Sequence, residues 1–206
     1  DFCLSRGLGD VYKRQYIDVV GSTTGKVLGT SKESVNFGIQ VTGASKGTDT
    51  TEGAYYKGYL YDSSTTATVT TSGATVYRIF KPSTNTKYTV SRYLENANDN
   101  TYTLYDTTTK TGTTDSEVTI ANLKDSTLLV TNGIYYSYGQ VDEKTVTSTT
   151  IKGDGTRVIK LYYARTSGTL KTVAGENIES VTVQNSVKYY YGATVPSLTA
   201  KTMTIE

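Results

Sequence analysis

The side chains that most often do chemistry in proteins are scarce in this chain. It holds no histidine, and its one cysteine is Cys3. Without histidine, the Ser-His-Asp and Cys-His arrangements that activate a nucleophile are excluded, as is a histidine-rich zinc site. Carboxylate pairs for glycoside hydrolysis remain available, but none stands in a recognisable catalytic context. We therefore predict a protein that is not an enzyme, with no catalytic residue, no metal site and no cofactor.

Three short polar motifs resemble ligand sites in part. GSTTGK at 21–26 resembles a phosphate-binding loop, but Val27 follows the lysine where such a loop carries Ser or Thr. NANDN at 96–100 and KGDGT at 152–156 carry the oxygen ligands that calcium prefers, yet neither has the spacing of an EF-hand. Asn, Asp and Gly tolerate a left-handed backbone, so we interpret both stretches as turns. The Asp-Gly step at 154–155 predicts a tight hairpin turn.

Tyrosine is the remaining candidate for ligand contact, and it occurs in pairs and in one triplet. Its ring offers an apolar face to a sugar and a hydroxyl for hydrogen bonding. Neighbouring residues of a strand point to opposite faces, so each pair would expose about one ring. The competing interpretation is packing within and between strands. The candidates for glycan binding are Tyr55, Tyr56, Tyr135, Tyr136, Tyr138, Tyr162, Tyr189 and Tyr190.

The elements that carry these residues are predicted to be strands. The 206 residues include 19 tyrosines and many Thr and Val, which suit a pleated, half-buried surface and form helices poorly. The formal net charge of +2 is too small to favour nucleic acid or an anionic membrane surface as a partner. No hydrophobic run reaches the length that crosses a bilayer. We expect a mainly β protein with no nucleic-acid partner and no membrane insertion.

An internal repeat organises the sequence. Residues 55–84 and 135–167 both run from a Tyr-rich strand through a Thr-rich strand and a Gly turn to an apolar strand, and they align at a spacing of 82 residues. The alignment predicts one repeat over 16–84, a second over 85–166, and an incomplete third over 167–206.

The second repeat gives the clearest strand pattern. A short helix is expected around 121–130. In the last strand of the repeat, Ile159, Leu161 and Tyr163 share one face, which we place in the core, and Val158, Lys160 and Tyr162 share the other. The predicted strands are 88–96, 102–112, 117–123, 127–139, 145–152 and 157–165.

The opening segment differs from the rest of the chain. Residues 5–15, SRGLGDVYKRQ, are basic and free of threonine, and they resemble the in-frame translation of a transposase adapter used to prepare sequencing libraries. We therefore set residues 1–15 aside as non-native. We also expect the chain to be a fragment of a longer protein, with any export signal and anchor outside it.

A family resemblance is visible in both repeats. Its features in the second repeat are Tyr88-Thr89-Val90, Tyr93-Leu94, Tyr102-Thr103-Leu104, Thr111-Gly112-Thr113 and the exit strand from Gly155 to Arg165. They resemble the mucin-binding-protein (MucBP) repeats and internalin B-type repeats of Gram-positive surface proteins. Residues 16–30, YIDVVGSTTGKVLGT, are similar to the opening of a MucBP repeat. The resemblance implies tandem β-grasp-like modules, and an Ig-like β-sandwich is the alternative.

The same resemblance implies a function at the bacterial cell wall, outside the cell. It implies a cell-surface adhesin whose repeats act as a stalk, as weak multivalent sites for mucin-type glycans of a host or the environment, or as both. Neighbouring repeats of the same chain would be the other partners. The alternative is an accessory β module of a secreted carbohydrate-active enzyme whose catalytic domain lies outside this fragment.

Overall fold

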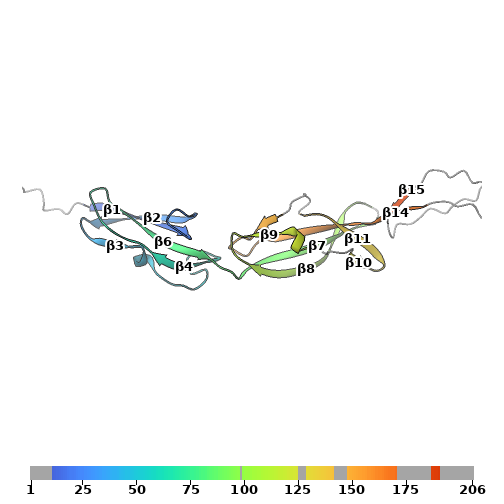
Figure 1. The fold of residues 1–206 in the computed structure, drawn as a ribbon, viewed down its shortest axis with the longest axis horizontal. Helices are drawn as coiled ribbons and strands as arrows, with labels where there is room; N and C mark the ends of the chain where they lie inside the picture. Colours follow the sequence, from blue (N-terminus) through green and yellow to red (C-terminus); the bar gives the residue numbers. More distant parts are fainter. Residues whose placement is uncertain (1–10, 98, 125–128, 142–147, 171–186, 191–206) are drawn as a thin grey trace, which may run out of the picture. The chain divides into compact units, whose positions relative to one another are not determined.

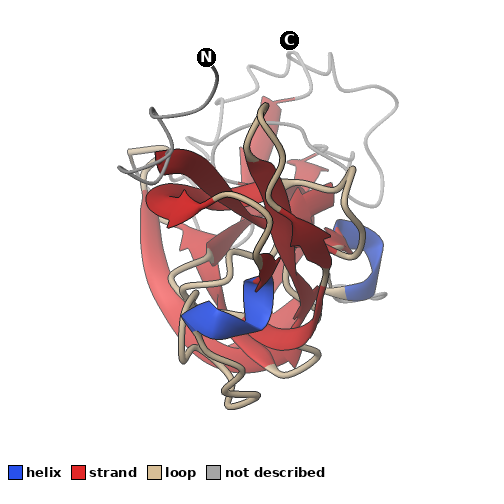
Figure 2. Cartoon of the chain, turned by 90° about the vertical axis from the view of Figure 1, so that its left-hand side faces the viewer, coloured by secondary structure: helices blue, strands red, loops and turns tan. Residues whose placement is uncertain are grey.

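The computed structural model describes residues 11–97, 99–124, 129–141, 148–170 and 187–190. These residues lie mostly in strands, and the helices among them are two short 3₁₀ turns (Figure 2). The prediction of a mainly β protein built from small β-rich repeats is confirmed. None of the helices in the described ranges is long and apolar enough to cross a membrane.

Four strands form the first sheet, in the order β2-β1-β6-β4 (Figure 1). Their bounds are Val11–Val20 for β1, Val27–Asn36 for β2, Tyr59–Ser64 for β4 and Ala74–Pro82 for β6. β1 runs antiparallel to β2 and parallel to β6, and β6 runs antiparallel to β4. The two central strands are therefore the first and the last of the sheet, a β-grasp-like arrangement.

A small two-stranded ribbon packs on the first sheet. It pairs β3 (Gln40–Thr42) with β5 (Thr66–Thr68), and the 3₁₀ turn η1 (Gly43–Lys46) follows β3. Val41 and Val69 from this ribbon region form a buried cluster with Tyr16 and Val76 of the sheet. The core of the first sheet thus lies under a ribbon and a 3₁₀ turn, where a β-grasp module would carry a helix.

Five strands form the second sheet, in the order β10-β11-β13-β7-β8. Read from β8, the order β8-β7-β13-β11 corresponds to β2-β1-β6-β4 of the first sheet. Smaller pairs are β9 (Glu117–Thr119) with β12 (Ser148–Thr150), and β14 (Ser167–Leu170) with β15 (Val187–Tyr190). The sheet's bounds are Thr86–Glu95 for β7, Tyr102–Gly112 for β8, Leu129–Thr131 for β10, Ile134–Val141 for β11 and Val158–Arg165 for β13.

The turns of the second repeat differ from prediction in two places. The predicted strand 127–139 is divided by Asn132 and Gly133, which both have positive φ, 50° and 74°, and join β10 to β11 as a hairpin. This Asn-Gly step is the strongest short hairpin signal in a sequence, and it was overlooked. Gly155 has the expected positive φ of 72°, but the predicted hairpin there is wrong, because β12 pairs with β9 and not with β13.

The predicted helix around 121–130 is reduced to a 3₁₀ turn, η2 (Ile120–Asn122), and residues 125–128 lie outside the described ranges. The predicted core face of β13 is confirmed, because Ile159, Leu161 and Tyr163 are all fully buried. On the opposite face Val158 and Lys160 are exposed, whereas Tyr162 is only 4 % exposed. The ring of Tyr162 stacks on Tyr93 at 5.1 Å between centroids and meets the ring of Tyr102 edge-on at 5.0 Å.

Contacts divide the chain into two compact units. Unit 1 takes the residues up to 89 together with 109–118 and 149–157, and unit 2 takes 90–108, 119–148 and the residues from 158 onward. The predicted boundary between residues 84 and 85 falls between the strands of the two sheets. Of the predicted third repeat, only β14 and β15 belong to the described residues beyond 166, so its extent stays a prediction.

Residues 11–15, which the sequence led us to set aside, form the beginning of β1. Val11 pairs with Asn36, and Gln15 pairs with Lys32 on one side and with Thr75 on the other. A strand ladder is made by backbone N–H and C=O groups, which every residue except proline supplies in full. An adapter-derived segment can therefore lengthen a native strand, and the origin of residues 1–15 stays a prediction.

Candidate functional site

A buried ion pair lies within the first sheet of unit 1. Asp18 of β1 and Arg78 of β6 are direct partners in the parallel ladder, and both are more than nine-tenths buried. Arg78 donates from Nε to Oδ1 of Asp18 at 2.8 Å and from Nη2 to Oδ2 at 2.6 Å. This two-pronged geometry is what a buried ion pair needs to offset the loss of hydration.

Neighbouring groups complete the hydrogen bonding of this pair. Arg78 Nη1 donates to the carbonyl oxygen of Lys46 at 2.9 Å, and the Tyr56 hydroxyl donates to Oδ2 of Asp18 at 2.6 Å. Burial, together with the hydrogen bond to Asp18, raises the pKa of Tyr56 to about 12. Each guanidinium nitrogen of Arg78 has an acceptor, so the cluster presents no free acid, base or nucleophile. It stabilises the sheet rather than forming a reactive site.

Lys26, Tyr59 and Asp115 form a second polar cluster in unit 1. Lys26 Nζ donates to both carboxylate oxygens of Asp115 at 2.9 Å, and the Tyr59 hydroxyl donates to Oδ2 at 2.5 Å. The hydrogen bonds to Tyr59 and Asp115 raise the pKa of Lys26, so the amine stays protonated and cannot act as a base or nucleophile. The cluster therefore links three segments of unit 1 that are distant in sequence, around residues 26, 59 and 115.

Glu33 on β2 gathers positive charge at the surface of unit 1. It accepts hydrogen bonds from Lys46 and Arg14, and these bonds lower its pKa to about 2. The Arg14 guanidinium also lies 4.4 Å from the ring centroid of Tyr16. Because the carboxylate is already paired with two cations, it is not available to a ligand.

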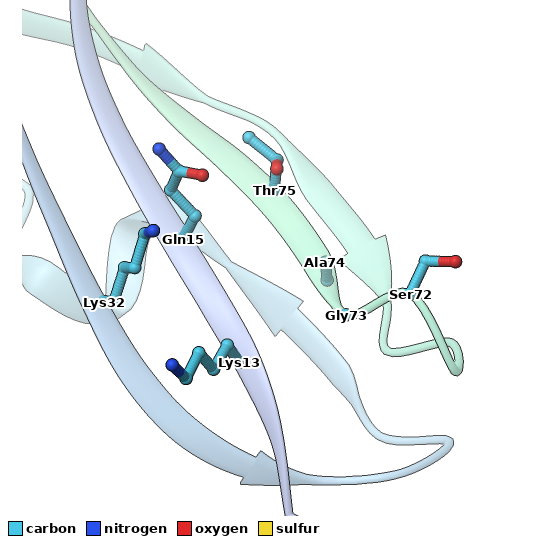
Figure 3. A pocket seen from close by; sticks show the side chains of 7 residues that line it. All are labelled: Lys13, Gln15, Lys32, Ser72, Gly73, Ala74 and Thr75. Atoms are coloured by element: carbon cyan, nitrogen blue, oxygen red, sulfur yellow. The ribbon is translucent and has the colours of Figure 1, made fainter.

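A hollow of about 410 Å³ opens on the first sheet and is shown in Figure 3. Lys13 and Gln15 from β1 and Lys32 from β2 face it, with residues 72–75 on the far side. Two lysines would suit an anionic ligand. However, Lys13 and Gln15 belong to the predicted adapter-derived segment, so we assign this hollow no function.

Another hollow, of about 260 Å³, lies in unit 2. It is lined by Leu94, Glu95, Asn96, Thr103, Leu104, Tyr105, Thr131, Asn132 and Tyr136. Leu104 is 52 % exposed and Tyr105 43 %, so apolar surface stands open beside carboxylate, amide and hydroxyl groups. This mixture of an open aromatic ring with polar groups is typical of small-ligand sites.

The predicted glycan-binding tyrosines are not gathered in one place. Tyr55 and Tyr56 pack edge-on against Phe80 at 5.9 and 5.2 Å between ring centroids. The other described side chains lie in unit 2: Tyr136 and Tyr162 are buried, Tyr138 is half-buried, and Tyr135 is 38 % exposed. Tyr189 and Tyr190 lie in β15, opposite Gly168 and Ser167. Among the candidates whose side chains the structure describes, Tyr136 alone lines the hollow of unit 2.

Two groups of residues that the structure singles out were missed from sequence. The pair Asp18–Arg78 had a signal, because each charge stands in an apolar strand segment, YIDVV and VYRIF. Glu95, Tyr105 and Asn132 had none, because they are separated in sequence and meet only through the arrangement of strands. Among the described residues no group of three or more His, Cys, Asp or Glu side chains is placed to hold a metal ion.

Comparisons with known proteins found distant likenesses among solved structures. No protein-family model matches the chain, and no curated protein matches it. Among solved structures, it is similar to domains 3-4 of the Streptococcal High Identity Repeats in Tandem (SHIRT) of a cell surface protein. The sequence identity is 17 %, the match covers 75 % of this chain and 98 % of that chain, and the TM-score is 0.29. A likeness with that TM-score does not establish a common fold.

Proposed function

We propose that the chain is a non-enzymatic, load-bearing repeat segment of a bacterial cell-surface protein. The observation that carries this proposal is the parallel ladder between β1 and β6, which runs from Arg14 opposite Ala74 to Val20 opposite Phe80. These are the first and last strands of the first sheet, so they are where the chain enters and leaves it.

That geometry determines how the sheet responds to tension. When both ends of the chain are pulled, β1 and β6 are drawn past each other along their length. All the ladder hydrogen bonds between them are then loaded together, whereas bonds at the open end of a hairpin are loaded one at a time. The second sheet repeats the strand order, with β7 beside β13. A spacer that holds a distal domain away from a cell wall needs this resistance.

The pairing of the charged groups within unit 1 fits the same role. The charged clusters of unit 1 are internally paired, and the core positions are filled by Tyr, Val, Phe and Ile. A stalk needs stable repeats in series, each stabilised chiefly by its own core and its neighbours.

Single-molecule pulling of the full chain tests the spacer. We expect two separate unfolding events, each releasing roughly 25 nm of chain, since about 75 residues extend by 3.3–3.6 Å each. The test variant is Val76→Pro, which removes a ladder hydrogen bond between β6 and its neighbours. It should lower the force of one event and leave the other unchanged. A single event, or two events at forces too low to resolve, would contradict the proposal.

A second candidate function is weak glycan contact by unit 2. The hollow that Tyr105 lines supports it, because this tyrosine ring is exposed beside polar groups, the combination through which proteins hold sugars. The two functions are compatible, since repeated weak sites on a stalk gain avidity from their linkage.

A further inference from the structure

Each repeat carries a loop of the same geometry, between β2 and β3 in the first repeat and between β8 and β9 in the second. At the centre of these loops Gly38 has a φ of 78° and Asp115 a φ of 63°. The N–H of Gly38 donates to the oxygen of the buried Val69, and the N–H of Asp115 to that of the buried Ile151, both at 3.0 Å. In each case the partner's own N–H donates back to the next loop residue, at 2.9 and 3.0 Å. The two loops are therefore equivalent parts of the repeat.

The Asp115 loop, residues 114–116, is covered by the end of the first repeat. Thr114 is only 1 % exposed, and its N–H donates to the oxygen of Ser83, just after β6, at 2.9 Å. Asp115 accepts a hydrogen bond from the hydroxyl of Tyr59, the first residue of β4. All these contacts lie within unit 1. The end of a repeat thus provides a place where a loop of this kind packs.

The Gly38 loop, residues 37–39, has no such cover among the described residues. Phe37 is 56 % exposed and Ile39 is 42 % exposed. A Cβ atom added to Gly38 would meet nothing within 4 Å. The ring of Phe37 lies 5.5 Å from that of Tyr12 and is largely exposed nonetheless. Two large apolar side chains therefore face water on a loop whose equivalent in the second repeat is buried.

The hollow of unit 2 lies where, in unit 1, the Asp115 loop packs. Tyr136, which lines the hollow, corresponds to Tyr59, because each stands opposite the last residue of β13 or of β6. The residue before each tyrosine accepts a backbone hydrogen bond from the residue after that strand, at 2.9 and 2.8 Å. The hollow is therefore the place at the end of the second repeat that corresponds to the loop-binding surface of the first.

The lining of the hollow suits an apolar loop rather than an acidic one. Leu94 is buried, and Leu104 is 52 % exposed. In unit 1 the carboxylate of Asp115 is paired with a lysine, whereas the described residues that line the hollow include no lysine or arginine, and Glu95 adds a negative charge. An acidic loop would lose hydration there without gaining a partner. The Gly38 loop carries no charged side chain.

We propose that the hollow of unit 2 binds the Gly38 loop of a second copy of this chain. The ring of Phe37 packs against Leu94 and Leu104, and Ile39 lies beside it. Because the two surfaces differ, the contact is head-to-tail and joins chains in series rather than in a symmetric pair. A loop in the hollow would exclude a sugar, so this use of the hollow is an alternative to glycan contact. The load-bearing role does not depend on it.

The first test is sedimentation of the full chain. We expect its mean mass to rise between about 10 µM and about 1 mM protein, because a contact this small binds weakly. Phe37→Ser should weaken the association at least about tenfold, since it removes a large apolar side chain from the contact. The matched control is Val27→Ser. Val27 is 56 % exposed, like Phe37, but belongs to neither surface, so the association should stay unchanged.

A mixture of two variants then locates the contact. Phe37→Ser keeps the hollow and loses the loop, whereas Leu104→Asp keeps the loop and places in the hollow a charge that the ring would have to desolvate. Each variant alone should stay monomeric, and the mixture should restore the contact. In NMR spectra of the isotope-labelled Phe37→Ser chain, the unlabelled Leu104→Asp chain should shift the amide signals of Leu94, Leu104 and Tyr136.

Three results would overturn the proposal. The first is a chain that stays monomeric up to about 1 mM, where a weak contact of this size should be populated. The second is equal weakening by Val27→Ser and Phe37→Ser, which would indicate unspecific apolar association. The third is a mixture of the two variants that leaves the signals of the hollow unchanged. None of them bears on the load-bearing role, because pulling is done on single molecules.

Discussion

In the first sheet, an aspartate and an arginine lie buried in the two central strands, whereas the core faces of the corresponding strands of the second sheet carry valine, isoleucine and leucine. The correspondence follows from the strand orders, which equate β1 with β7 and β6 with β13. Along β6 the buried residues are Val76, Arg78 and Phe80, and the core face of β13 carries Ile159, Leu161, Tyr163 and the buried Arg165.

The other pair of corresponding strands, β1 and β7, can be compared in the same way. Tyr16 and Asp18 are the buried, alternating residues of β1, as Tyr88 and Val90 are of β7. In place of the ion pair Asp18–Arg78, the core faces of β7 and β13 carry Val90, Ile159 and Leu161. The same strand order forms around a buried ion pair in the first sheet and around apolar side chains in the second. The fold therefore requires a filled core in these strands but does not require charge.

The comparison also corrects the alignment of the two repeats. The spacing of 82 residues places the half-buried Tyr77 and Ile79 opposite the fully buried Ile159 and Leu161. Shifting the alignment by one residue places the buried Val76, Arg78 and Phe80 opposite buried residues of β13. Since side chains alternate between faces with a period of two, a one-residue error exchanges the core face for the other face.

The most severe test is to break the ion pair of the first sheet. We expect Asp18→Ala to lower the free energy of unfolding of unit 1 by about 3–5 kcal/mol, because Arg78 is left buried without a counter-charge. Urea unfolding of the full chain, followed by NMR signals from each unit, measures the loss and shows that unit 2 keeps its own transition.

The matched variant makes the first sheet resemble the second. Asp18→Val, Arg78→Met and Tyr56→Phe together remove the charges and the hydroxyl that depends on them, and we expect stability near that of the unaltered chain. If this triple variant lost as much stability as Asp18→Ala, the ion pair itself would be essential to unit 1, and an apolar core like that of the second sheet could not replace it.

A smaller effect is expected where an ion pair is accessible to water. Arg92 donates from Nε to Oδ1 of Asp106 at 2.8 Å, and the two side chains are 25 % and 35 % exposed. Since water screens such a pair, Asp106→Asn should lower the free energy of unfolding of unit 2 by about 0.2–1 kcal/mol. The same urea experiment checks it, and a loss comparable to that of Asp18→Ala would contradict the contrast between buried and exposed pairs.

The smallest effect concerns the exposed carboxylate of Glu33. Its pKa is lowered from 4.5 to about 2 by hydrogen bonds from Lys46 and Arg14. A lowered folded-state pKa means that the stabilisation is complete above about pH 4.5 and is lost as the pH falls toward 2, because the unfolded chain takes up the proton first. The difference in unfolding free energy between the unaltered chain and Glu33→Gln should therefore shrink across this range. A difference that stays constant from pH 6 to pH 2 would show that Glu33 is not paired in solution.

Much of the fold follows from local sequence patterns. The predicted strand 102–112 has the bounds of β8, and the predicted core face of β13 is the buried one. Both succeed because the alternation of Thr, Tyr and Val with buried residues fixes which face a strand turns inward. The surroundings of the candidate tyrosines were much harder to predict. The sequence of a tyrosine pair does not show which of its rings contacts a residue on another strand. Tyr56 donates a hydrogen bond to Asp18, which lies 38 residues away in the sequence. Tyr162 stacks on Tyr93, which lies 69 residues away.

By itself the sequence determined that this protein is made of β strands and that the residue types for nucleophilic catalysis by histidine are missing, because both depend on composition and short-range pattern. Only the tertiary structure decided which strands are neighbours, and so which charges meet. Asp18 finds Arg78 because β1 and β6 lie side by side, whereas Arg165 ends in a buried position where its Nε and Nη1 have no hydrogen-bond partner. The physical reason is that pairing between strands is a long-range event, and an ion pair across a ladder exists only once the register of that ladder is set.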